Sequence, residues 1–215
     1  MWLKKSSRFL LTGKSFNRTE LNWDWEVLER RPRVKPMKES LPSLLSTYRE
    51  TFPHESPTVD IIIQFIERNP EGFQRKNLEG HVTGSAWVVD PAGEKVLLTH
   101  HKKLGKWLQL GGHADGEKDV LRVAIREAQE ESGLAGLVPV SEQIFDVDIH
   151  AIPERPGEPS HFHYDIRFAV KASKTEPLVV SGESRELAWV PISDLARYSG
   201  EESLLRMKRK WESPL

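Results

Sequence analysis

One segment, residues 111–134, constrains this chain more than any other. Three of its carboxylates, Glu127, Glu130 and Glu131, are spaced so that on a helix they fall within an arc of about 100°. A separate apolar stripe can pack on a core, and it consists of Leu121, Ala124, Ile125 and Ala128. Clustered carboxylates repel one another unless a cation joins them, and all-oxygen ligand sets favour Mg²⁺ or Mn²⁺ over Zn²⁺. The segment therefore predicts an amphipathic helix that binds a hard divalent metal ion.

The same segment resembles the Nudix box, the signature of the Nudix hydrolases, in the bacterial type that opens with GGHADG. Gly112 begins the match, and the second half of the signature is complete; it comprises Arg126, Glu127, Ala128, Glu130, Glu131, Gly133 and Leu134. One position departs, because the first glutamate of the box falls on Lys118, with Glu117 one residue early. The resemblance therefore predicts the metal-binding trio, but not the helix-start contact that usually supports the box arginine.

The resemblance, which covers most of residues 80–195, implies a fold and an activity. The fold is an α/β/α sandwich with a mixed sheet, extended here by N-terminal helices. The activity is hydrolysis of a phosphoanhydride, in a nucleoside diphosphate linked to another group, by attack of water. A catalyst of this reaction must neutralise the phosphate oxygens and generate hydroxide, and bound divalent ions do both. In this reading the three glutamates hold Mg²⁺ or Mn²⁺, while Arg126 orients the carboxylates.

A further carboxylate is often supplied in this family by a distant loop, as general base or as an extra metal ligand. Glu183 stands six residues before Trp189, which resembles the spacing found in Nudix pyrophosphohydrolases of the nucleoside-triphosphate type. Glu186 is the neighbouring candidate. We expect Glu183 to serve the catalytic site, although loop glutamates are commonly just solvated.

Histidines form a second constellation. His161, His163 and Asp165 alternate and would share one face of a strand. Isopentenyl diphosphate isomerases share the Nudix fold and bind a metal through histidines at positions resembling His81 and His113, together with two acids on a strand resembling the one that bears His163. They also need a cysteine where this chain has Gly111, so an isomerase is the weaker reading. Our hypothesis is an auxiliary metal or phosphate-contact site formed by His81, His113, His163 and Asp165; the alternative is that these residues only satisfy strand ends and turns.

Composition limits the other function classes. The 215 residues contain no cysteine, which excludes disulfides and cysteine nucleophiles and fits a cytoplasmic protein. The formal net charge of −1 gives no general reason to expect binding to nucleic acid or membranes. The resemblance implies a small nucleoside diphosphate derivative as the partner, and a homodimer is compatible with it. The competing class is a Nudix-like module that binds nucleotides without turnover, but the complete glutamate trio favours an enzyme.

The chain divides into three predicted parts. Residues 1–39 form a basic, flexible arm, because the first 18 residues carry five Lys or Arg and no acid; an organellar transit peptide and translated sequence upstream of Met37 are the alternatives. Residues 40–75 form a helical cap, with helices that end near Phe52 and Asn69. Residues 76–215 form the Nudix domain, with the box at 112–134.

The order of elements within that domain predicts a mixed sheet with helices on both faces. Strands are expected at 82–89, 95–100, 107–110, 144–149, 162–171 and 187–190, and helical stretches after the box at 192–195 and 203–211. Trp107 and Tyr164 could stack on a base, although aromatic side chains are expected in any core of this size.

Overall fold

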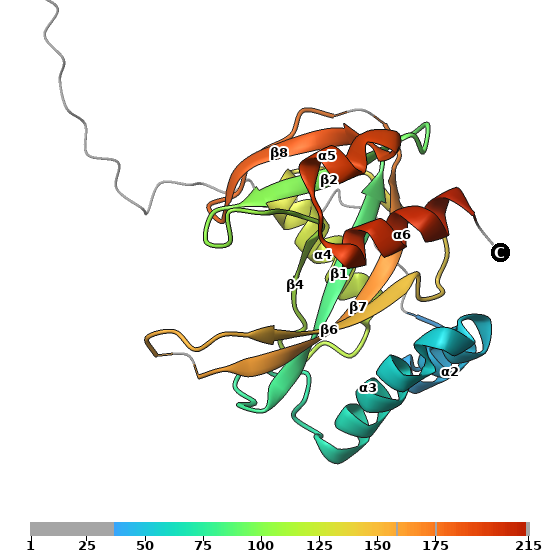
Figure 1. Cartoon of the computed structure of the whole chain (residues 1–215), viewed down its shortest axis with the longest axis vertical. Helices are drawn as coiled ribbons and strands as arrows, with labels where there is room; N and C mark the ends of the chain where they lie inside the picture. Colours follow the sequence, from blue (N-terminus) through green and yellow to red (C-terminus); the bar gives the residue numbers. More distant parts are fainter. Residues whose placement is uncertain (1–36, 158, 175, 214–215) are drawn as a thin grey trace, which may run out of the picture. The chain divides into compact units, whose positions relative to one another are not determined.

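A mixed β-sheet forms the centre of the molecule (Figure 1). The computed structural model describes residues 37–157, 159–174 and 176–213. Strands β1 and β7 run parallel along their whole length, and every other pairing is antiparallel. The strands are β1 (Gly80–Val89), β2 (Lys95–His101), β3 (Trp107–Leu108), β4 (Leu110–His113), β5 (Leu137–Pro139), β6 (Asp146–Ile152), β7 (His161–Ala172) and β8 (Ser184–Pro191).

Strand β1 pairs with two different strands, β4 and β2, along the same edge. This arrangement determines where β4 lies relative to the box helix. Strand β4 pairs with the middle of β1, from Thr83 to Ala86, whereas β2 meets β1 only where Val89 faces Val96. Strands β3 and β8 then continue the sheet from β2, while β5 and β6 pair with β7. The two halves of the sheet therefore separate beside β4, next to the start of the box helix.

Helices cover both faces of the sheet. Helices α2, α3 and α4 share one hydrophobic core with the even-numbered face of β1, and α5 and α6 pack with Trp87 and Val89 on the other. This arrangement is the predicted α/β/α sandwich with an N-terminal helical extension. The helices are α2 (Leu41–Thr51), α3 (Ser56–Arg68), α4 (Val120–Ser132), α5 (Leu195–Tyr198) and α6 (Glu202–Glu212), with short 3₁₀ turns η1 (Pro53–Glu55) and η2 (Ile192–Asp194).

Local sequence sets the ends of α4, the box helix. Asp119 caps its start by accepting a hydrogen bond from the backbone N–H of Arg122 (3.1 Å), and Gly133 ends it in the left-handed conformation, with φ of 75°. The predicted apolar stripe of this helix is confirmed, because Leu121, Ala124, Ile125 and Ala128 are all buried. The helix therefore presents its carboxylates on the side that the core leaves free.

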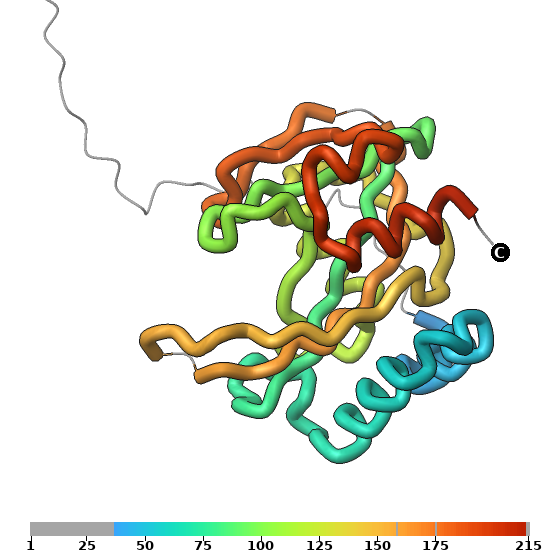
Figure 2. The backbone as a smooth tube through the Cα atoms, viewed as in Figure 1, coloured from blue at the N-terminus to red at the C-terminus, as the bar shows by residue number. Residues whose placement is uncertain are grey.

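A buried ion network ties the helical extension to the sheet and to α6. Its centre is Asp146, which is fully buried in β6 and contacts Arg167 of β7 at 3.0 Å, Arg206 at 2.8 Å and Lys210 at 2.6 Å. Lys210 also reaches Glu55 in η1 at 2.7 Å. Lys210 of α6 also donates to the hydroxyl of Tyr48 in α2, so this network joins two helices that are far apart in the sequence, as the colours of Figure 2 show.

The structure departs from the sequence-based expectation in a few places. The expected strand 107–110 is divided at Gln109 into β3 and β4, β6 begins two residues after the start predicted for it, and the short β5 was not predicted. The predicted basic arm lies almost wholly outside the described residues. No described helix has the length and apolar character needed to cross a membrane.

Candidate functional site

The three glutamates of α4 lie on its free side, and they differ in exposure. Glu130 is exposed, whereas Glu127 and Glu131 are half-buried. Glu131 approaches the backbone of Gly111 in β4, yet among the residues that the structure describes its buried Oε2 has no hydrogen-bond partner. A buried carboxylate oxygen without a donor is costly unless a positive charge compensates it. This all-oxygen donor set therefore fits a hard divalent cation.

Burial and mutual repulsion also perturb these acids. Burial raises the pKa of Glu127 to about 7, opposed by the neighbouring charge of Arg126 and reinforced by Glu130. Burial raises the pKa of Glu131 to about 8, and the charges of Glu127 and Glu183 add to the effect. A bound cation would favour the ionised form of both groups, so the acids and a cation stabilise each other.

Gly112 allows β4 to approach the box helix closely. A Cβ atom at this position would lie 2.3 Å from Glu127 Oε2, far inside van der Waals contact. The glycine that opens the box is therefore required by the position of a carboxylate rather than by a turn conformation.

Replacing Gly112 with alanine is expected to lower turnover about 10–100-fold, the range found when the support of a metal ligand is lost, because the Glu127 carboxylate must rotate away. The matched control is Gly200→Ala, where a Cβ atom meets nothing within 4 Å. Steady-state kinetics and Mn²⁺ titration calorimetry measure both effects. Unchanged activity and Mn²⁺ affinity in Gly112→Ala would show that this close approach has no catalytic importance.

Arg126 links the box helix to the turn before it. Its Nη2 donates to the backbone carbonyl of His113 (2.9 Å) and lies 3.0 Å from Glu127 Oε1. The departure at Lys118 leaves the helix start intact, because Glu117 accepts a hydrogen bond from the backbone N–H of Asp119 (3.0 Å). Arg126 is thus placed to orient Glu127 without the missing box glutamate.

Glu183 is exposed in the loop that leads into β8. This loop is fixed to the β2–β3 turn, because the backbone N–H of Lys102 donates to the carbonyl of Glu183 (3.0 Å) and its Nζ to the carbonyl of Gly182 (2.7 Å). The charge of Glu183 adds to the burial that raises the pKa of both Glu127 and Glu131, so this loop lies within electrostatic range of the acids of α4. Glu186 lies further along β8, opposite His100 of β2.

Two further charged residues adjoin these acids and were not predicted. Arg75 Nε donates to Asp115 Oδ1 (2.6 Å), and this ion pair holds the pKa of the Asp115 carboxyl below its usual range. The charge of Arg75 also acts on Glu127 and Glu183. Asp115 lies in the GGHADG turn with a positive φ of 50°. Nothing in the sequence around Arg75 marks it, since its partner is 40 residues away.

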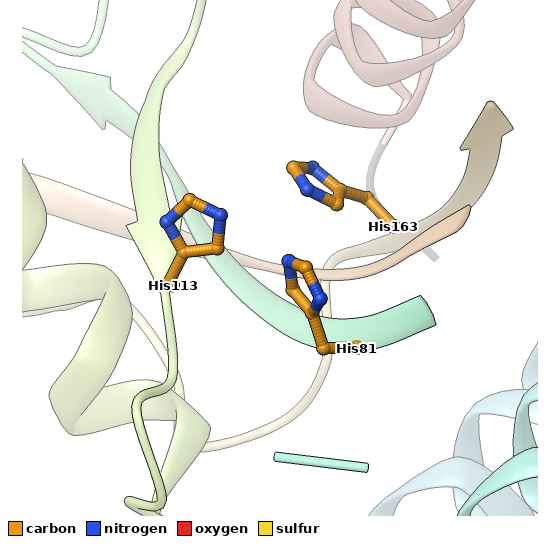
Figure 3. Close-up of side chains that lie close together, drawn as sticks. All are labelled: His81, His113 and His163. Atoms are coloured by element: carbon orange, nitrogen blue, oxygen red, sulfur yellow. The ribbon is translucent and has the colours of Figure 1, made fainter. Parts of the chain in front are cut away.

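Of the four residues in the hypothesised histidine site, three lie close together and Asp165 does not join them. One ring nitrogen from each of His81 in β1, His113 in β4 and His163 in β7 lies within 4.8 Å of the other two, and Figure 3 shows the three rings around a shared space. Burial, reinforced by neighbouring histidines, lowers the pKa of His81 to about 4 and that of His163 to about 2. These imidazoles are therefore neutral at pH 7.

Asp165 has different contacts from those hypothesised. Its buried carboxylate accepts hydrogen bonds from the four side chains of Thr83 (2.9 Å), Ser85 (2.8 Å), Gln109 (3.3 Å) and Arg167 (2.7 Å). With this many donors the carboxylate is already satisfied, and it stands apart from the three converging histidines.

The two aromatic candidates for base stacking, Tyr164 and Trp107, lie in different environments. Tyr164 is 6% exposed and stacks on Phe65 of α3 with a ring-centroid distance of 3.8 Å, so it belongs to the core. Trp107 is half-buried between His100, which is stacked on it at 5.1 Å, and Tyr198. Tyr164 is therefore unavailable as a platform for a base.

A model of the NUDIX domain matches residues 79–210, more than half of the chain. The chain therefore belongs to the Nudix family and is an enzyme of the pyrophosphohydrolase class; the predicted family and enzyme class are confirmed. No curated protein sequence matches it.

Three solved structures illustrate the similarity. A C. elegans Ap4A hydrolase in a binary complex is 18% identical, covers 61% of this chain and 94% of that chain, and has a TM-score of 0.50. A NUDIX-family hydrolase from Clostridium perfringens is 29% identical over 61% and 96%, with a TM-score of 0.44. The E. coli dihydroneopterin triphosphate pyrophosphohydrolase is 14% identical over 60% and 92%, with a TM-score of 0.47. The first comparison supports the Nudix fold.

Proposed function

We propose that this chain hydrolyses the phosphoanhydride of a nucleoside diphosphate linked to another group, with Mg²⁺ or Mn²⁺ held by Glu127, Glu130 and Glu131. The observation that carries the proposal is the buried Oε2 of Glu131, which has no hydrogen-bond partner and lies on the same helix as two further carboxylates. When bound, the cation offsets the charge of the diphosphate and favours deprotonation of the attacking water.

The other residues have separate roles. Arg126 holds the Glu127 carboxylate through the 3.0 Å contact and fixes the box turn through the His113 carbonyl. Arg75, whose side chain is 60% exposed beside the acids, supplies a positive charge where a diphosphate would lie. Glu183, in the loop before β8 and within electrostatic range of these acids, accepts the proton of the attacking water.

The test is turnover on a panel of compounds with Mg²⁺, with Mn²⁺ and with a chelator, with products identified by mass. The panel contains ADP-ribose, nucleotide sugars, dinucleoside polyphosphates, oxidised nucleotides and nicotinamide dinucleotides. Metal-dependent cleavage of a phosphoanhydride is the expected result. Ligand-induced thermal stabilisation without turnover on any compound would instead support the nucleotide-binding module.

Replacing Glu183 with glutamine is expected to lower kcat about 100-fold, the usual scale of a general base, and to leave KM nearly unchanged. The matched control is Glu186→Gln, an exposed glutamate of the same segment that we expect to behave as the unaltered enzyme. The pH profile of kcat distinguishes a general base from a metal ligand. If Glu183 is the base, the fall of kcat at low pH that its protonation causes should disappear in the variant. A fall in Mn²⁺ affinity with that limb retained would assign Glu183 as a metal ligand instead.

A further inference from the structure

His81 is a buried histidine of β1 whose ring lies beside the backbone of Asn77. Its ring is 2% exposed, and within the described part of the chain neither ring nitrogen has a hydrogen bond of acceptable geometry. Leaving such groups buried and unsatisfied is unfavourable, so native structures rarely keep them without a reason. The ring lies 4.9 Å from that of His113 and 4.7 Å from that of His163, centroid to centroid.

The three histidines come from three adjacent strands. His81 is paired in register with His163 across the parallel β1–β7 ladder, and His113 faces Thr83 across β1–β4. Rings contributed by rigid strands have little freedom to separate, so their convergence is a property of the sheet. His161 is also adjacent, with its Nε2 at 3.3 Å from Nε2 of His163.

This cluster lies on the other side of β4 from the glutamates. Gly112 faces α4, since a Cβ atom there would contact Glu127. Successive residues of a strand point to opposite faces, so the next residue, His113, points away from the box helix. The histidines are therefore separate from the acids already described.

We propose that His81, His113 and His163 form a second metal site, for a borderline transition-metal ion of the zinc class. Imidazole nitrogens suit Zn²⁺, whereas Mg²⁺ prefers oxygen ligands and would not compete here. Zinc takes histidine nitrogens at about 2.0–2.1 Å in tetrahedral geometry, which places the ligand atoms roughly 3.3 Å apart. Because the present separations are at most 4.8 Å, the rings must turn inward on binding to reach that value. His161 is the nearest candidate for the fourth position, which water could also fill.

The test is metal content and ligand-field spectrum, neither of which depends on turnover. We expect the intact protein, loaded with Zn²⁺ and dialysed against Mg²⁺ buffer, to keep about one zinc ion per chain, and its Co²⁺ form to show the intense visible bands of a tetrahedral site. Zinc affinity should fall at least about a hundredfold in His113→Gln and in His163→Gln. Removing a residue that binds the metal should lower affinity at least as much as removing a residue that only orients a metal ligand.

Two controls locate the ion. His54→Gln changes an exposed histidine with 74% of its side chain accessible and should retain zinc. Glu131→Gln should also retain zinc, which separates this site from the glutamates. Zinc-free intact protein after loading, or zinc that is lost in Glu131→Gln but kept in His113→Gln, would overturn the proposal. The spectrum of the unaltered protein keeps the test decisive even where a histidine variant fails to fold.

Discussion

Replacing Glu131 with glutamine is expected to reduce hydrolysis about 10²–10³-fold. Loss of a charged ligand removes several kcal/mol of stabilisation from the transition state, and each 1.36 kcal/mol corresponds to a factor of about ten in rate. The substitution keeps the shape of the side chain and its approach to Gly111, but it removes the charge from a position where an Oε2 atom is buried without a partner. Steady-state kinetics at saturating Mg²⁺ measure the loss.

The fold of this variant should persist. Burial raises the pKa of Glu131 to about 8, so in the metal-free protein at pH 7 this carboxyl is already largely neutral, and a neutral amide of the same shape should not lower the melting temperature. Glu50→Gln, an exposed glutamate on α2, is the control and should retain full activity. Near-normal turnover in Glu131→Gln would mean that the reaction does not depend on this carboxylate.

The largest expected loss of stability follows from Asp146→Asn, at about 3–5 kcal/mol of unfolding free energy. The carboxylate is fully buried and accepts from Arg167, Arg206 and Lys210, so the substitution leaves three cations around a neutral group. Removing one partner of a buried ion pair lowers stability by far more than the whole pair contributes, because the remaining charge stays buried without a partner. Urea unfolding measures the change.

An exposed ion pair provides the comparison. Asp60 pairs with Arg49 at 3.0 Å, with 42% and 52% of the two side chains accessible, and Asp60→Asn should cost only about 0–1 kcal/mol. Equal small losses in both variants would show that the Asp146 network contributes little to holding α2, α6 and the sheet together.

The sequence was sufficient to predict what depends on local pattern. The apolar stripe of α4 and its carboxylates follow from helical spacing, and the alternation of His161, His163 and Asp165 places them on one face of β7. The sequence does not predict which neighbouring side chains each residue contacts. Asp165 alternates with His163 as expected, yet Thr83 and Arg167 satisfy it, and these contacts depend on strand register.

Long-range ion pairs were missed for the same reason. Arg75 and Asp115 meet across 40 residues of sequence, and Asp146 meets Lys210 across 64. A charged residue has no periodic signature, so only the folded arrangement of β6 and α6 identifies its partner. Strand β5 was missed because it has only three residues and ends in a proline, which is typical of an edge.

The most direct test of hydrolysis by water attack uses the substrate found by the panel in water enriched with ¹⁸O. We predict that one phosphate product gains a single labelled oxygen, that a chelator abolishes this incorporation, and that Glu131→Gln reduces it in parallel with turnover. Products that form without label, or labelling that continues at the same rate in the presence of a chelator, would contradict metal-dependent attack of water at the box helix.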